Sequence, residues 1–230
     1  MMGLDAEAWT AVVLSLRVAL VATIVSLPLG LLVAYALARW RFPGRQLLNV
    51  VVHLPLVLPP VVTGYLLLLT FGPQGPIGAV LEAIGLGIAF RWTGAVVAAA
   101  IMAFPLMVRA IRLAIEAVDT KLEAAAHTLG APPRAVFLTV TLPLIAPGIV
   151  AGATLAFAKA LGEFGATITF VSNIPGVTQT IPSAIYAFLQ VPGREGAVYT
   201  LVILSILISI GALAVSEVWA ARIARRIRGD

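Results

Sequence analysis

The chain alternates between long apolar stretches and short connections rich in glycine, proline and charge. A helix needs about 20 predominantly apolar residues to cross the hydrocarbon core of a bilayer. Five stretches are long enough to do so, at roughly residues 10–38, 47–71, 92–115, 143–171 and 197–220. The pattern therefore predicts an all-α integral membrane protein with about five transmembrane helices.

The composition agrees with a location in the membrane. Hydrophobic residues make up 61% of the chain and charged residues 11%, whereas a soluble domain is about one quarter charged. The first nine residues carry Asp5 and Glu7 and no positive charge, and a long apolar run follows, which favours an uncleaved first helix over a secretory signal. The absence of cysteine excludes disulfides, thiolate nucleophiles and cysteine-based metal sites.

The positive charges predict an orientation, because cytoplasmic loops are enriched in lysine and arginine. With the N-terminus outside and the C-terminus inside, the outer loops hold only Arg91 and Arg194. The cytoplasmic segments then hold 11 of the 15 cations: Arg39, Arg41, Arg45, Arg109, Arg112, Lys121, Arg134, Arg222, Arg225, Arg226 and Arg228. Topology thus accounts for the basic balance, and nucleic-acid binding is not expected. We expect residues 9–220 to form the transmembrane domain and residues 221–230 a basic cytoplasmic tail at the lipid surface.

Prolines interrupt two of the predicted spans. Pro55, Pro59 and Pro60 fall in the second span and Pro105 in the third, and each proline removes a backbone donor and kinks a helix. Lipid cannot satisfy the freed carbonyl groups, so broken helices survive where they face protein or a water-filled path. We expect the cluster in the second span to line such a path, together with Thr63. The alternative is that these kinks only help helices to pack.

The fourth predicted span carries two ionisable residues, Lys159 and Glu163. They are four residues apart and share one helix face, and such residues inside a span mark a pathway or a paired interior site. Neutral donors that suit a weakly held oxyanion follow toward the outer end. They are Thr167, Thr169 and Asn173. The alternative is that Lys159 and Glu163 neutralise each other and, with Gly162 and Gly165, serve helix packing alone.

Two segments outside the spans are predicted to be short helices. Thr180 can cap a helix over residues 180–190, which is too short to cross and is expected to lie on or dip into the outer surface; an ordered loop without a gating role is the alternative. On the cytoplasmic side, Asp119 can cap an alanine-rich helix at about 120–129 that Gly130 ends. A second short helix is expected after Pro132, before Pro143 starts the fourth span.

The cytoplasmic segment resembles the coupling loop of binding-protein-dependent ABC importers. The family pattern is Glu-Ala-Ala, three residues, Gly, nine residues, a β-branched residue, one residue, Leu-Pro. The matching positions here are Ala125, Ala126, Gly130, Val140, Leu142 and Pro143. Ala124 takes the position of the family's glutamate, and this chain has its glutamate one residue earlier, at Glu123. The resemblance implies a type 1 transmembrane domain whose coupling helix, with Asp119 as its cap, docks into a separate ATPase subunit.

No nucleotide site is expected in this chain. A P-loop needs lysine after glycine, whereas the two lysines, Lys121 and Lys159, follow Thr120 and Ala158. ATP and magnesium are therefore expected on the partner ATPase, and this chain is expected to hold no cofactor. His53 and His127 are too isolated for a metal site, and no catalytic residue is expected.

Two further runs, 53–65 and 157–176, resemble the molybdate permease subunits. Sulfate and thiosulfate permeases share the Gly-Glu-aromatic-Gly element, which adds Phe164 to the candidate path. The Asn-Ile-Pro-Gly run at 173–176 and Thr-Ile-Pro at 180–182 are more characteristic of the molybdate branch. The candidate path comprises Pro59, Pro60, Thr63, Lys159, Gly162, Glu163, Phe164, Gly165, Thr167, Thr169 and Asn173.

The resemblance implies ATP-driven import of molybdate, with tungstate left open, across the prokaryotic cytoplasmic membrane. The expected partners are a second copy of the chain, two cytoplasmic ATPase subunits and an external molybdate-binding protein. A sulfate, thiosulfate or other oxyanion permease is the nearest alternative. A membrane-embedded enzyme would need a catalytic constellation, and a secondary transporter would usually show an internal repeat; we find neither in the sequence.

Overall fold

The computed structural model describes residues 6–228, apart from the side chains of residues 223, 224 and 226–228. Within that range the chain is helical and contains no strand. The helices are α1 (Ala6–Arg39), α2 (Arg45–Val57), α3 (Pro60–Phe71), α4 (Gly78–Ala83), α5 (Trp92–Glu116), α6 (Thr120–Thr128), α7 (Pro133–Val136), α8 (Leu142–Leu161), α9 (Gly165–Val171), α10 (Ile181–Phe188) and α11 (Glu195–Arg228), with a π-helical turn, η1 (Phe137–Thr141), between α7 and α8.

Four helical segments of the described chain are long and apolar enough to cross a bilayer, namely Ala6–Arg39, Trp92–Glu116, Pro133–Leu161 and Glu195–Arg222. The pair α2 and α3 makes a fifth if it counts as one bent span. The prediction of an all-α membrane protein with about five spans is therefore confirmed.

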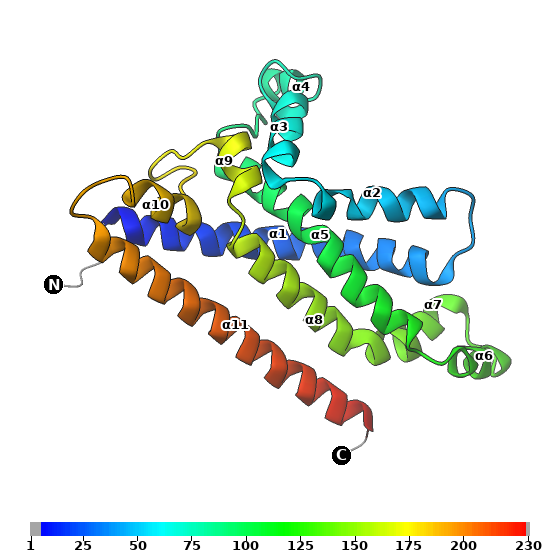
Figure 1. The fold of residues 1–230 in the computed structure, drawn as a ribbon. Helices are drawn as coiled ribbons and strands as arrows, with labels where there is room; N and C mark the ends of the chain where they lie inside the picture. The colour runs from blue at the N-terminus through cyan, green and yellow to red at the C-terminus, as the bar shows by residue number, and fades with distance from the viewer. Residues whose placement is uncertain (1–5, 229–230) are drawn as a thin grey trace.

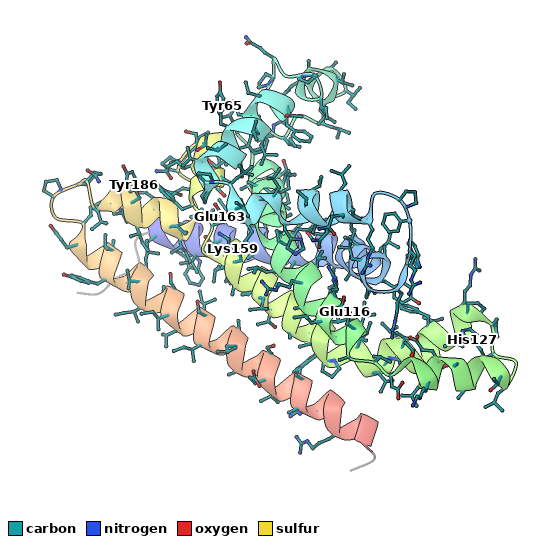
Figure 2. All side chains as sticks on the ribbon, turned by 45° about the vertical axis from the view of Figure 1, so that its right-hand side comes forward. Tyr65, Glu116, His127, Lys159, Glu163 and Tyr186 are labelled. Atoms are coloured by element: carbon teal, nitrogen blue, oxygen red, sulfur yellow. The ribbon has the colours of Figure 1, made fainter. Side chains whose placement is uncertain are left out.

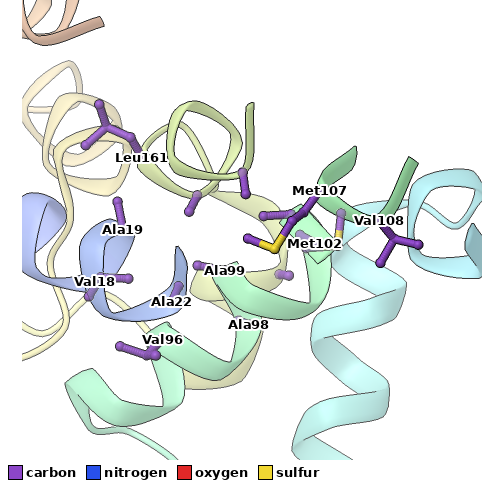
Figure 3. Close-up of a cluster of buried hydrophobic side chains, with 14 of the residues drawn as sticks. Val18, Ala19, Ala22, Val96, Ala98, Ala99, Met102, Met107, Val108 and Leu161 are labelled. Atoms are coloured by element: carbon purple, nitrogen blue, oxygen red, sulfur yellow. The ribbon is translucent and has the colours of Figure 1, made fainter. Parts of the chain in front are cut away.

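The core lies where α1, α5 and α8 cross, and it is built largely from alanine. Ala19 and Ala22 of α1 meet Ala98 and Ala99 of α5 with at most 1% of each residue exposed (Figure 3). Without a hydrophobic force between helices in lipid, small side chains bring helix backbones close enough for dispersion contacts. The glycines of α8 serve the same end, because a Cβ added at Gly148 would lie 2.2 Å from the Ala114 side chain.

The last helix, α11, runs along α8 and has few other neighbours (Figure 1). Only 11% of the most apolar 18-residue stretch of α11 is buried within this chain. The remaining surface is apolar, as a helix that faces lipid or another membrane-embedded surface requires. The helix continues through Arg222 to Arg228, so the described part of the predicted basic tail is helical; residues 229 and 230 lie outside the described range.

The bundle has two distinct ends, which we name by the short helices found there. At the α6 end, α6 and α7 extend beyond the long helices; at the α10 end, α10 lies across the first turns of α1 (Figure 1). Thr180 caps α10, as predicted, and forms a capping box with Ser183. Two interactions attach the segment around α10 to α1. The Ser15 hydroxyl accepts a hydrogen bond from Ile181 N at 2.7 Å, and Arg194, just before α11, forms an ion pair with Glu7 at 2.7 Å.

The second predicted span is interrupted at its proline cluster, as expected, and the interruption is much sharper than a kink. The helix breaks at residues 58–59, and α3 turns away from α2 by 113°. Neither Pro59 nor Pro60 has an N–H to continue the α2 ladder, and Pro60 then starts α3, a position that proline favours. The loop after α3 also contains a helix, α4, that the sequence pattern did not indicate.

The fourth predicted span begins and ends differently from expectation. It starts at Pro133 rather than Pro143, because α7, η1 and α8 join without a break. In the wide π-turn Leu142 N donates to Phe137 O, five residues back, and the turn carries the chain into Pro143 without a stop. The span then breaks at 162–164 before α9. By contrast, Pro105 does not interrupt α5, which is held on both sides by packing against α1 and α8.

Ser15→Ala should destabilise the attachment of α10 to α1. The variant leaves the buried Ile181 N–H without its acceptor, which costs roughly 1–3 kcal/mol. A lower midpoint of thermal unfolding in detergent would measure the loss. Ser205→Ala is the matched control, because among the described residues the Ser205 hydroxyl bonds only to Leu201 O in its own helix; equal midpoints for the two variants would contradict the expectation.

Candidate functional site

The predicted coupling helix is present as α6 and stands apart from the bundle. Asp119 caps it, with Oδ1 accepting from Lys121 N at 2.9 Å, and Gly130 follows it at φ +85°, a backbone conformation that suits glycine. No side chain of α6 is buried. Leu122 is 50% exposed and Leu129, just after the helix, 89% exposed. Figure 2 shows His127 of α6 far from the centre of the molecule.

The other predicted coupling-loop residues lie on α6, in the π-turn and in the first residues of α8. Ala124 and Ala125 are exposed on α6 and Ala126 is partly buried. Val140 lies in the π-turn, and Leu142 and Pro143 begin α8. The loop is thus a hairpin: α6 projects away from the bundle, and the chain then turns back into α7, where the span Pro133–Leu161 begins.

Glu123 lies on the side of α6 that faces the bundle. Its Oε1 accepts from the Thr141 hydroxyl at 2.7 Å and from Arg39 Nη2 at 3.4 Å. Arg39 Nη2 also donates to Val118 O at 3.2 Å. The sequence motif located Glu123 but not these partners. Thr141 occupies the position between Val140 and Leu142 at which the family motif allows any residue, and Arg39 lies far from the motif in the sequence.

The two breaks in the transmembrane helices meet in space at what we call the junction, residues 58–60 and 162–165. A Cβ at Gly165 would lie 2.7 Å from Pro60 Cβ, and one at Gly64 would lie 2.5 Å from Ala166 O. Helices α3 and α9 therefore start beside each other and run together, as Figure 1 shows. Only glycine permits this approach at Gly64 and Gly165.

Lys159 and Glu163 form an ion pair at the junction, with Nζ and Oε2 2.6 Å apart (Figure 2). Glu163 is 3% exposed, and its other oxygen accepts from Ala166 N at 3.0 Å. This carboxylate therefore joins the end of α8 to the first turn of α9 across the break. The arrangement agrees with the packing alternative for the pair and places the pair beside the second-span break.

The remaining predicted path residues surround the junction on α3, on α9 and beyond. Thr63 and Thr167 are buried, and Thr63 Oγ1 has no hydrogen-bond partner among the described residues. The Thr169 hydroxyl donates within its own helix to Gly165 O. Asn173 follows α9, and its buried Oδ1 is likewise without a partner in the described range.

A cleft of about 470 Å³ opens beside the junction, between α8, α10 and α11. Gly162 and Phe164 line it on one side and Tyr186 on another, with the Phe164 and Tyr186 rings 5.3 Å apart. Its lining is mainly apolar; Ser205 and Ser209 contribute polar groups from α11. The break in the fourth span thus borders a space that is open on the outside of one copy of the chain.

The chain matches a family model over residues 26–229. The model describes the binding-protein-dependent transport system inner membrane component. The chain belongs to this family. It is a multi-pass protein of the prokaryotic cytoplasmic membrane, in agreement with its long apolar helices.

Curated relatives cover almost the entire chain. The molybdenum transport system permease protein of Escherichia coli strain K12 is 59% identical over 96% of each chain. The protein with the same description from Haemophilus influenzae is 53% identical over 95% of this chain and 96% of its own. Among solved structures, a bacterial alginate ABC transporter in complex with an alginate-bound periplasmic protein has a TM-score of 0.72 at 19% identity, over 97% of this chain and 80% of that one.

In the part of the chain that the structure describes, no group of three histidine, aspartate or glutamate side chains lies close enough to bind an ion. Both histidines instead contact backbone oxygens nearby, His53 Nδ1 at 2.8 Å from Asn49 O and His127 Nδ1 at 3.1 Å from Ala131 O.

Gly64→Val should separate α3 from α9 and destabilise the junction. The added side chain meets Ala166 backbone atoms, which cannot move aside like a flexible side chain. We therefore expect overpacking to lower the free energy of unfolding by roughly 1–3 kcal/mol. Thermal unfolding in detergent measures the loss. Gly211→Val on α11 is the control, because a Cβ there meets nothing within 4 Å; an equal loss at both positions would show that the close approach is unimportant.

Proposed function

We propose that this chain is the permease subunit of an ATP-driven importer that moves molybdate across the cytoplasmic membrane by alternating access. The observation that carries the proposal is the 59% identity, over 96% of the chain, to a protein described as a molybdenum transport permease. Tungstate is a second candidate substrate, because it is an oxyanion of the same charge and shape. An external molybdate-binding protein delivers the ion.

In the proposed orientation the α6 end faces the cytoplasm and the α10 end faces outward. The cations support it: Arg39, Arg112 and Lys121 all lie toward the α6 end, whereas Arg194 is at the α10 end. Residues 9–220 form the transmembrane domain in this proposal, and the basic residues of 221–230 end α11 at the cytoplasmic lipid surface.

The ATPase is a separate subunit that binds to α6. Support comes from the exposure of α6, from Leu129 with 89% of its surface open, and from the absence of a P-loop lysine in this chain. Exposed apolar side chains on a helix that projects from the bundle are suited to a groove in a protein partner. ATP and magnesium bind to that partner, and this chain holds no cofactor.

The ion passes at the junction, between two copies of the chain. Half-helices that begin inside a membrane place their positive N-terminal ends where an anion must travel, and broken backbone is tolerated where it lines a cavity. Here α3 begins beside Lys159 and Glu163, a pair without net charge, and the Thr63 hydroxyl is free to donate. The adjoining cleft is open on one copy, and a second copy would enclose it.

Molybdate transport is tested in liposomes that contain this chain, its ATPase and its binding protein. Labelled molybdate should accumulate only with ATP, and excess unlabelled molybdate should abolish the signal. A tenfold excess of sulfate should compete weakly; equal competition would favour a general oxyanion permease. Uptake by this chain without any ATPase would contradict an ATP-driven mechanism.

Leu129→Asp should weaken docking of the ATPase by at least about tenfold, because burying a charge without a partner costs more than the roughly 1.4 kcal/mol that this factor requires. Co-purification of the ATPase with the tagged permease measures docking. Leu189→Asp is the matched control, since Leu189 is also a largely exposed leucine, at 64%, but lies at the α10 end. Retained docking in the Leu129 variant would remove this residue from the proposed interface.

A further inference from the structure

The side-chain hydrogen bonds from α6 to the long helices converge on one oxygen atom. In the described chain, each hydrogen bond that links α6 to the transmembrane helices ends on Glu123 Oε1. The bonds at Asp119 and His127 stay within the loop itself. No residue of α6 is buried, and its main contacts are with α7 and η1.

The Glu123 carboxylate connects elements that are far apart in the sequence. Arg39 is the last residue of α1, and its guanidinium also holds Val118 O, just beyond the end of α5. Thr141 is the last residue of the π-turn that leads into α8 and is 1% exposed. Side chains of Arg39 and Glu123 are each 17% exposed, so water screens their attraction only in part.

The span that begins at this point leads straight to the junction. The helix from Pro133 to Leu161 has 29 residues, which at 1.5 Å per residue gives a rod of about 43 Å. Its far end is the break that Lys159 and Glu163 bridge. A displacement applied to the near end of a continuous helix reaches the far end, whereas a loose connection to α6 would absorb it.

We propose that Glu123 is a positioning residue that makes α6, the end of α1 and the start of α8 move as one unit. This inference rests on the proposed docking of an ATPase to α6. Glu123 itself faces the bundle rather than the partner. When the ATPase shifts α6, the carboxylate carries that shift to α1 and α8, and through α8 to the junction.

Loss of Glu123 should loosen α6 without unfolding it. The helix keeps its Asp119 cap and its glycine end, and Arg39 keeps Val118 O as an acceptor. We therefore expect the loss of Glu123 to lower the amount of molybdate moved per ATP hydrolysed. A residue with a purely structural role would reduce the amount of folded protein but leave the transport per ATP unchanged.

The test uses the complete transporter in liposomes and measures molybdate uptake and ATP hydrolysis together. For Glu123→Ala we expect the ATPase to co-purify as in the native protein and the molybdate moved per ATP to fall by about threefold to tenfold, since charge-assisted hydrogen bonds are lost. Glu123→Gln, which keeps an acceptor oxygen, should lie between. Glu116→Gln is the control, because Glu116 pairs with Arg112 in its own helix at 2.8 Å.

Two further variants test whether Thr141 acts through the Glu123 carboxylate. Thr141→Val, nearly isosteric in a buried position, should lower the transport per ATP in the same direction. Thr141→Val combined with Glu123→Ala should be no worse than Glu123→Ala alone, because the Thr141 hydroxyl donates to the Glu123 carboxylate and residues that act through one contact are not additive. Additive losses would overturn the shared contact.

The outcomes also distinguish this inference from the function on which it rests. An unchanged molybdate-to-ATP ratio in Glu123→Ala overturns the inference, and so does failure of that variant to bind the ATPase, since Glu123 would then belong to the docking face. If the native chain binds no ATPase at all, the proposed function itself fails. The chain has no cysteine, so spin labels at Lys121→Cys on α6 and Arg41→Cys, two residues after the end of α1, can report directly whether Glu123→Ala broadens the distribution of distances between them.

Discussion

The structure depends on one constraint, which is that lipid offers no hydrogen bonds to an interrupted helix. Two of the spans are interrupted, at 58–59 and 162–164, and the protein brings both interruptions to the same place. Gly64 and Gly165 remove the side chains that would keep α3 and α9 apart. Glu163 then supplies an acceptor to Ala166 N, and Lys159 neutralises that buried carboxylate. The break at 162–164 is therefore tolerated because the first turn of α9 finds its acceptor inside the protein.

The α6 end obeys a different rule, because it lies outside the bundle and needs no buried surface. Helix α6 is stabilised locally by its Asp119 cap and its alanine content, and its only described side-chain bonds to the long helices converge on Glu123. Because α6 is stabilised by itself and has few contacts with the bundle, a partner can bind and move it without unfolding it. The same projection continues through the π-turn into α8 and so reaches the junction by covalent structure.

Much of this organisation follows from local sequence. The apolar periodicity locates the long helices, Asp119 and Gly130 delimit α6, and Thr180 begins α10, because caps and hydropathy act over a few residues. The prolines at 59 and 60 correctly mark a break, and the spacing of Lys159 and Glu163 correctly predicts that they meet. Local sequence misleads at Pro105 and Pro143, where packing against α1 and α8 or a widened turn keeps a helix continuous.

By itself, then, the sequence determined which segments cross the membrane and which residues begin and end the short helices, since those properties depend on neighbours along the chain. Only the tertiary structure decided that the two breaks coincide, that α3 turns by 113°, and that Arg39 and Thr141 converge on Glu123. Apart from the turn of α3, these are contacts between residues that lie 18 or more positions apart in the sequence. Their geometry is set by how closely the alanine and glycine faces of α1, α5 and α8 can pack, which no single segment specifies.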